Sequence, residues 1–193
     1  SGENQLGDGS ELITGLNTRN QSLIWTDNAV HAMEFVGPPF IFNFRQLGSN
    51  CGIAGQHAAI ELDGRVFWMG AKDFFVYDGA VKALPCSVRR YVYDDFNFDQ
   101  KEKVYAGTNQ EFREVTWLYP SRNSTEVDRY VSYNPVENYW TFGTTIFTTW
   151  EDKEVFQNVI TTGQATSTTN YLYTNEPEGL YTADGQKQEA FLE

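Results

Sequence analysis

The stretch Ala58 to Val81, AAIELDGRVFWMGAKDFFVYDGAV, indicates consecutive β-hairpins. Its short runs are rich in apolar and aromatic residues, and Asp-Gly separates runs at Asp63-Gly64 and at Asp78-Gly79. Asp-Gly between alternating strands is a strong hairpin signal, because the tight turn requires positive φ at both central residues. The stretch therefore predicts an antiparallel unit with strands at 58–62, 66–69, 74–77 and 81–88.

The aromatic strand of this unit has counterparts elsewhere in the chain. A similar run of strand-forming residues surrounds Trp25, Trp117 and Tyr173, so that with Trp68 the anchor aromatics recur every 43 to 56 residues. Periods of about 40 to 50 residues with four strands per repeat are typical of β-propellers. We therefore predict an all-β fold, a β-propeller with about four four-stranded blades. The predicted blades, in one propeller domain or part of one, span about 11–48, 52–90, 101–147 and 156–193.

The other three repeats can be divided into strands in the same way. The expected strands are 11–18, 23–26, 29–36 and 40–44 in the first repeat; 104–106, 114–119, 129–133 and 139–142 in the third; and 158–162, 171–175, 180–183 and 190–192 in the fourth. A single sheet cannot bury both faces, so stacked repeats would bury the aromatics between them. A two-sheet sandwich with the same number of strands is the alternative.

Closure of the ring is a difficulty for a propeller of this length. Four blades is the lower limit for a closed propeller, and no segment obviously pairs the first strand with the last. We therefore expect an incomplete arc of a larger propeller. The opening Ser1-Gly2 looks like a cleavage remnant, which also favours a fragment of a longer chain.

Composition supports a folded β protein. The chain has 193 residues, of which 40% are hydrophobic and 16% aromatic, and its apolar runs are dominated by residues that favour strands. The best helix candidate is Trp150 to Ile160. No apolar run is long enough to span a bilayer, so no membrane segment is predicted.

The net charge of −12 argues against a surface that grips nucleic acid. Phosphate contacts need clustered Lys and Arg. The dense basic positions are Arg89-Arg90 and Lys101 with Lys103, and they bracket Asp94, Asp95 and Asp99, which makes the local balance close to neutral. We interpret these basic positions as a solvated strand end.

The sequence contains no convincing catalytic constellation. His31 lies in an alternating strand, where a packed or solvent-facing side chain is expected, and His57 has no nearby nucleophile motif. Carboxylates such as Asp94-Asp95 could serve a glycosidase, but their separation in space cannot be read from sequence. We predict no catalytic residues and no enzyme activity.

Metal and cofactor sites are not predicted either. Cys51 and Cys86 lack zinc-type spacing, and we expect buried thiols rather than a disulfide. Asp95 to Asp99 matches the start of a calcium loop, but Gln100 stands where Gly is required and Ala106 where the bidentate Glu should be. Alternation of Phe and polar residues there indicates a strand.

Two stretches together resemble a known family. One is Gly52 to Val88, with FWMG, FFVYDG and LPC; the other is Glu114 to Trp140, with EVTWLYPS, DRYVSYN and ENYW. They resemble the propeller core of tail proteins from short-tailed bacteriophages, a group that includes packaged-DNA stabilisation proteins and tubular tail or nozzle proteins. The likeness covers roughly Leu23 to Glu193 and is a pattern of strands, not an active site.

The resemblance implies a structural role in the virion tail. Such proteins form a six-fold homo-oligomeric ring below the portal and adaptor, line the tail channel, and help to retain and then conduct the packaged DNA. Members are usually several hundred residues long, so the chain would be a fragment. The acidic balance fits a channel wall that DNA passes without specific binding.

Two other classes of function remain open from the sequence. A carbohydrate-binding or glycoside-processing propeller would stack exposed Trp and Tyr on sugar rings and use Asp or Glu as acid and base. A kelch-like module would bind another protein through loops at its blade edges.

Overall fold

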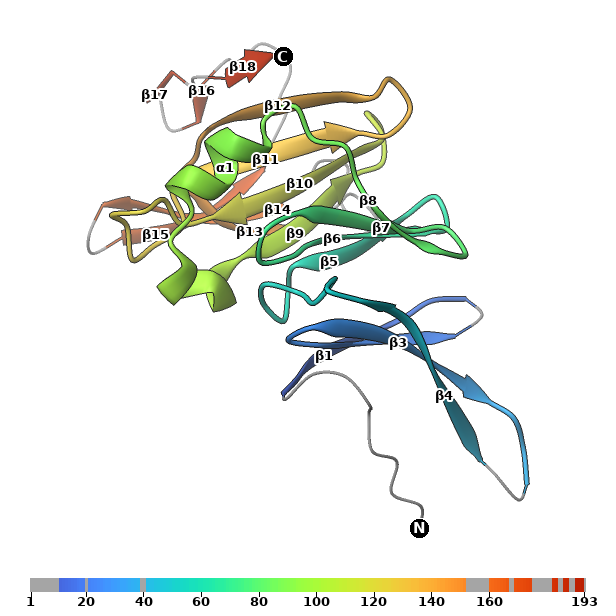
Figure 1. The fold of residues 1–193 in the computed structure, drawn as a ribbon. Helices are drawn as coiled ribbons and strands as arrows, with labels where there is room; N and C mark the ends of the chain where they lie inside the picture. The colour runs from blue at the N-terminus through green and yellow to red at the C-terminus, as the bar shows by residue number, and fades with distance from the viewer. Residues whose placement is uncertain are drawn as a thin grey trace. The chain divides into compact units, whose positions relative to one another are not determined.

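The computed structural model describes residues 11–19, 21–38, 41–151, 160–166, 169–174, 182–183, 186–187 and 190–192. The protein is mostly β, and every strand pairing in the described part of the chain is antiparallel. The chain divides into two compact units, Ser1–Pro85 and Cys86–Glu193, which are described separately (Figure 1). The expectation of an all-β chain needs one correction, because the second unit also contains helical segments.

The first sheet is a four-stranded meander, as predicted. Its strands, in the order β1-β2-β3-β4, are β1 (Leu12–Asn17), β2 (Ser22–Thr26), β3 (Ala29–Phe35) and β4 (Phe42–Ser49). The last strand is longer than expected and continues past Phe44 to Ser49. Phe40, where the prediction began this strand, lies outside the described residues.

The second sheet is also a four-stranded meander. Its strands, in the order β5-β6-β7-β8, are β5 (Ala59–Leu62), β6 (Arg65–Met69), β7 (Phe74–Tyr77) and β8 (Val81–Ala83). Asp63 and Gly64 have φ of 51° and 74°, which confirms the predicted tight turn. At the second Asp-Gly only Gly79 has positive φ, because Tyr77 pairs with Val81 and the loop holds three residues.

The core of the first unit lies where these two sheets meet. Trp25 and Trp68 are both fully buried, and their rings contact edge to face at a centroid distance of 5.5 Å. Trp68 Nε1 donates a hydrogen bond of 2.8 Å to the Cys51 carbonyl, in the segment that connects the sheets. Gln21 Nε2 donates to Tyr77 Oη at 2.7 Å and joins the sheets a second time.

In the second unit, a five-stranded sheet contains the third predicted repeat. Its order is β18-β12-β11-β10-β9, with β9 (Tyr105–Asn109), β10 (Glu114–Tyr119), β11 (Arg129–Asn134), β12 (Tyr139–Thr144) and β18 (Ala190–Leu192). Four strands follow the prediction. Assigning 190–192 to a fourth blade was wrong, because Phe191 pairs with Phe142 of this sheet.

The fourth predicted repeat does not form one four-stranded blade. A three-stranded sheet holds β13 (Phe147–Glu151), β14 (Ile160–Thr166) and β15 (Thr169–Thr174), and a separate pair holds β16 (Thr182–Ala183) and β17 (Gln186–Lys187). The helix expected at 150–160 is contradicted at both ends, since Trp150 lies in β13 and Ile160 begins β14. The residues 152–159 between them lie outside the described part.

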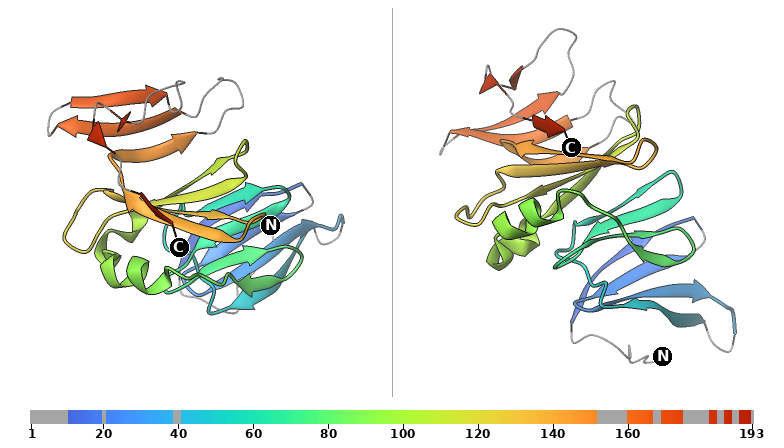
Figure 2. Two further views of the ribbon diagram at one scale, coloured as in Figure 1. Left: turned by 90° about the horizontal axis from the view of Figure 1, so that it is seen from above. Right: turned by 45° about the horizontal axis from the view of Figure 1, so that its top comes forward.

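The β13–β15 sheet packs beside the β9–β12 sheet, as the views in Figure 2 show. Phe147 forms a buried cluster with Leu118 and Val127. Trp150 Nε1 donates a hydrogen bond of 2.6 Å to the Thr108 carbonyl. A Cβ on Gly107 would collide with the Trp150 side chain, so this position needs glycine to let the sheets approach.

Helical structure replaces two predicted strand segments. The strand expected to run to Val88 ends at Ala83, and α1 (Arg89–Asp95) follows where a solvated strand end was predicted. The 3₁₀ segment η1 (Phe98–Lys103) follows it, so the strand expected from the Phe alternation was also wrong. Val88, Val92 and Phe96 are buried at four-residue spacing, which is the spacing of one face of a helix. The side chains of this segment favour strands, which is why a strand was predicted.

Candidate functional site

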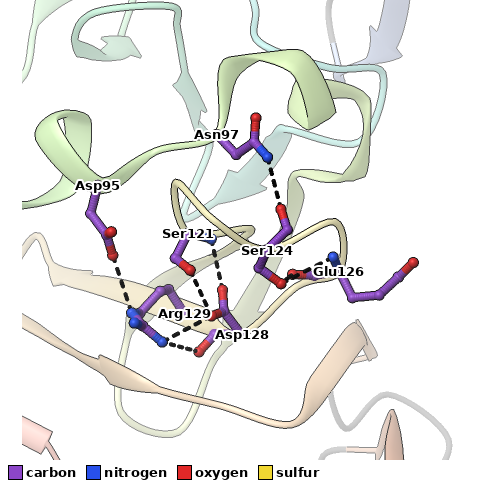
Figure 3. Close-up of polar contacts among 7 residues, drawn as sticks. All are labelled: Asp95, Asn97, Ser121, Ser124, Glu126, Asp128 and Arg129. Atoms are coloured by element: carbon purple, nitrogen blue, oxygen red, sulfur yellow. Dashed lines mark hydrogen bonds and ion pairs between the residues drawn. The ribbon is translucent and has the colours of Figure 1, made fainter. Parts of the chain in front are cut away.

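A group of neighbouring polar side chains lies in the second unit, where the β10–β11 loop meets α1 and η1 (Figure 3). We call it the polar loop cluster. It consists of Asp95, Asn97, Ser121, Ser124, Glu126, Asp128 and Arg129. That these side chains come together was not predicted from the sequence.

Asp128 closes the β10–β11 loop. Its Oδ1 accepts a hydrogen bond from the Ser121 backbone N–H at 2.7 Å, and its Oδ2 accepts one from Ser121 Oγ at 2.7 Å. Arg129 donates to the same Oδ2 from NH1 at 3.0 Å. Both carboxylate oxygens are therefore engaged, and the two ends of the loop are held together.

Arg129 connects this loop to the helix. Its Nε donates to Asp95 Oδ2 at 3.2 Å, at the last residue of α1. The Arg129 side chain is 25% exposed, and those of Asp95 and Asp128 are 35% and 32% exposed. Two carboxylates thus share one guanidinium, which balances part of their charge in a partly buried setting.

A second group of contacts connects the loop to η1. Asn97 Nδ2 donates to the Ser124 carbonyl at 2.8 Å, and its side-chain oxygen accepts from the Asp99 N–H at 3.1 Å, which caps η1. Lys103 Nζ contacts Glu126 Oε1 at 2.8 Å and also donates to the Thr125 carbonyl. The Asp95–Asp99 segment therefore caps a helical turn and holds a loop.

Tyr119 lies beneath the cluster. Its side chain is fully buried, its ring contacts Phe96 edge to face at 6.1 Å, and its Oη has no hydrogen-bond partner among the described residues. Burial raises the pKa of Tyr119 far above its usual value, and the nearby Tyr91 and Asp95 add to the shift. The hydroxyl is therefore held neutral.

The geometry of the cluster is that of a structural contact that holds the β10–β11 loop in place. The Ser121 hydroxyl donates to Asp128, and the same carboxylate also accepts from the Ser121 N–H and from Arg129, which closes the loop. Asp95 and Asp128 contact one arginine, whereas a glycosidase pair would be arranged around a bond to be cleaved. The arrangement suits holding α1, η1 and the loop in a fixed relation.

The other residues considered in the sequence lie apart from this cluster. His31 is buried in β3 opposite Ile24 and Gln46, and His57 is exposed just before β5. Cys51 is buried, Cys86 is half-buried, and they form no disulfide. In the described part of the chain, no three His, Cys, Asp or Glu side chains gather as a metal site.

Exposed apolar side chains mark two further surfaces. In the first unit they lie at the end of the β3–β4 hairpin, where Phe35 and Ile41 are 72% and 58% exposed. In the second unit, Phe112 and Val136 lie in the β9–β10 and β11–β12 turns, which Asn134 joins by donating from Nδ2 to the Phe112 carbonyl at 3.0 Å. Neither surface was predicted from the sequence.

The chain matches no protein family model and no curated protein sequence. Among the helices described, none is long and apolar enough to cross a membrane.

Proposed function

We propose that this chain is a structural module of a virion tail, with its sheets stacked as an arc of a β-propeller. It would form part of a homo-oligomeric ring that joins portal or adaptor proteins to the tail and lines a channel for packaged DNA. The resemblance of Gly52–Val88 and Glu114–Trp140 to tail proteins of short-tailed phages supports the class.

The observation that carries the proposal is the way consecutive sheets meet. In the first unit, Trp25 and Trp68 from successive meanders pack together at 5.5 Å. In the second, Trp150 of β13 packs on Gly107 and bonds to Thr108 of β9. Consecutive sheets joined through tryptophan are what a stack of blades requires, because each sheet has to bury its aromatic face on the next.

Charge supports the channel part of the proposal. The net charge of −12 would repel a polyanion at the channel wall, so DNA could slide without adhering. The polar loop cluster fits as well, because Arg129 in the cluster and Lys103 beside it hold loops in place. The proposed role needs rigidity and no chemical step.

The test is to locate the chain in purified virus particles. Particles produced from the genome that encodes it should contain the chain by mass spectrometry, in a constant ratio to the portal protein. Cryo-electron microscopy should place its density in a ring on the tail axis, six-fold if the resemblance to tail rings holds. Absence from particles that are complete and infectious would overturn the proposal.

A further inference from the structure

The β3–β4 hairpin extends beyond the rest of its sheet (Figure 1). β2 pairs with β3 no further than Met33, whereas β3 and β4 continue to pair as far as Phe35 with Phe42. We call residues 33–36 and 41–45 the hairpin arm. The arm is therefore a two-stranded extension of a four-stranded sheet.

One face of the arm is apolar. Phe35 lies directly opposite Phe42, and their rings contact each other at a centroid distance of 5.9 Å. Two residues along the strands, Met33 lies opposite Phe44, and side chains two residues apart share a face. Phe35 is 72% exposed and Phe42 is 47% exposed. Large exposed apolar side chains gathered in one place usually indicate a contact surface.

The arm has no net charge, although the chain is strongly acidic. Its charged residues are Glu34 and Arg45, which form an ion pair of 3.6 Å with each other. The Arg45 side chain is 56% exposed and can still meet another carboxylate. The net charge of −12 therefore lies outside the arm.

The second unit presents another apolar surface, on the adjoining β9–β10 and β11–β12 turns. We call residues 109–114 and 134–138 the turn tip, which exposes Phe112 by 49% and Val136 by 59%. Asn134 holds both turns, because its Oδ1 accepts from the Val136 N–H at 2.9 Å and its Nδ2 donates to the Phe112 carbonyl at 3.0 Å. A surface fixed in this way loses little conformational entropy when it binds.

The turn tip is acidic. It carries a net charge of −2, from Glu111, Arg113, Glu114 and Glu137. Two turn tips therefore repel each other, whereas the arm has no net charge and an exposed guanidinium. Charge favours a contact of the turn tip with the arm over a contact of the turn tip with itself.

We propose that the hairpin arm of one copy of this chain binds the turn tip of the next copy. The contact would bury Phe35 and Phe42 of one copy against Phe112 and Val136 of its neighbour. A contact between two arms would join only two copies and would leave every turn tip exposed. Arm against turn tip uses two different surfaces, and such head-to-tail contacts can close into a ring. The choice of two different surfaces rests on the proposed ring.

The first test measures association of the 193-residue chain, 22.0 kDa as a monomer, by analytical ultracentrifugation over a range of concentrations. Wild type should form species larger than a dimer. Phe35→Ser in the arm and Phe112→Ser in the turn tip should each weaken association about tenfold or more. Leu12→Ser is the control, because Leu12 is 63% exposed and belongs to neither surface, so association should not change.

Mixing the two variants tests the head-to-tail arrangement. Phe35→Ser keeps an intact turn tip and Phe112→Ser keeps an intact arm, so an equal mixture can make one good contact. The mixture should give a dimer of one copy of each variant and nothing larger, at concentrations where each variant alone is a monomer. Thermal unfolding of each variant by itself shows that both are folded before they are mixed.

Charge at position 43 of the arm provides a second measurement. Asn43 is exposed and lies opposite Glu34 in its own hairpin. Asn43→Lys should strengthen association several-fold, because the arm then attracts the acidic turn tip, and Asn43→Glu should weaken it by a similar factor. The same two changes at Asn123, an exposed loop position outside both surfaces, should have much smaller effects.

Three results would overturn the inference: a wild-type chain that stays monomeric, a Phe112→Ser variant that associates as well as wild type, or two folded variants that fail to form a dimer when mixed. A monomeric chain that is nevertheless found in virus particles would overturn this contact and leave the tail role intact. A chain that associates as expected but is absent from infectious particles would do the reverse.

Discussion

The two units of this chain build their sheets in different ways. In the first, both sheets are meanders in which each strand pairs only with its neighbours in sequence. In the second, the five-stranded sheet receives β18 from nearly 50 residues beyond β12, and two helical segments precede β9. The first unit therefore depends on local turn chemistry, and the second also depends on contacts between residues that lie far apart in the sequence.

Removing the tryptophan between the sheets should have the largest effect. Trp68→Ala removes a fully buried ring that contacts Trp25 and Phe75, together with its bond to the Cys51 carbonyl. We expect a loss of about 3–5 kcal/mol in unfolding free energy, measured by chemical denaturation.

The matched change in the second unit is Trp150→Ala. This ring is half-buried, so we expect a loss of about 2 kcal/mol. A larger loss for Trp150→Ala than for Trp68→Ala would reverse the proposed difference between the units.

Substitution of the glycine that lies where the first two sheets meet should have the next largest effect on stability. A Cβ on Gly52 would collide with the backbone carbonyl of Asp27, which cannot rotate away. Gly52→Ala should cost about 2–3 kcal/mol, by the same denaturation measurement, because the connecting segment has to shift.

Gly64→Ala is the control for this change. Gly64 has φ of +74° and no neighbour within 4 Å of an added Cβ, so the cost should be only about 1 kcal/mol of backbone strain. Equal losses at the two positions would show that close packing at Gly52 is unimportant.

The same contrast explains how much of the fold could be predicted. Asp63-Gly64 and the runs around Trp25 and Trp68 specify hairpins locally, so eight strands of the first unit were placed correctly from sequence, with errors mainly at strand ends. No local sequence pattern indicates the pairing of Phe191 with Phe142. The stacking of sheets was expected, but Trp150, which joins two of them, was assigned to a helix.

The polar loop cluster was unpredictable for a related reason. Asp95 and Arg129 are 34 residues apart and meet only after α1 and β11 have formed. The buried stripe Val88, Val92 and Phe96 could have revealed α1, but Val and Phe favour strands, and that preference decided the prediction.

Removing the carboxylate that closes the β10–β11 loop should have an intermediate effect on stability, confined to the second unit. Asp128→Ala removes the acceptor for the Ser121 N–H and Oγ and one partner of Arg129. We expect a loss of about 2 kcal/mol, with faster hydrogen exchange in residues 120–129.

Asp78→Ala is the control, because that carboxylate forms an exposed ion pair with Lys82 in the first unit and should contribute little. If Asp128→Ala and Asp78→Ala were equally mild, the cluster would have no structural importance.

The smallest expected effect has the opposite sign. Tyr119 is fully buried and its hydroxyl has no partner in the described structure, so Tyr119→Phe removes a polar group that folding desolvates without compensation. We expect a gain of about 1 kcal/mol at neutral pH.

Alkaline pH provides an independent check of Tyr119. Burial raises the pKa of Tyr119 in the folded protein, so the folded state holds this proton more tightly than the unfolded state, and stability falls as pH rises above the unfolded pKa, near 10. Tyr119→Phe should therefore lose less stability between about pH 9 and pH 11 than wild type does, in thermal unfolding followed by circular dichroism. Identical pH profiles would mean that the hydroxyl can reach water, contrary to the burial of the Tyr119 side chain against Phe96.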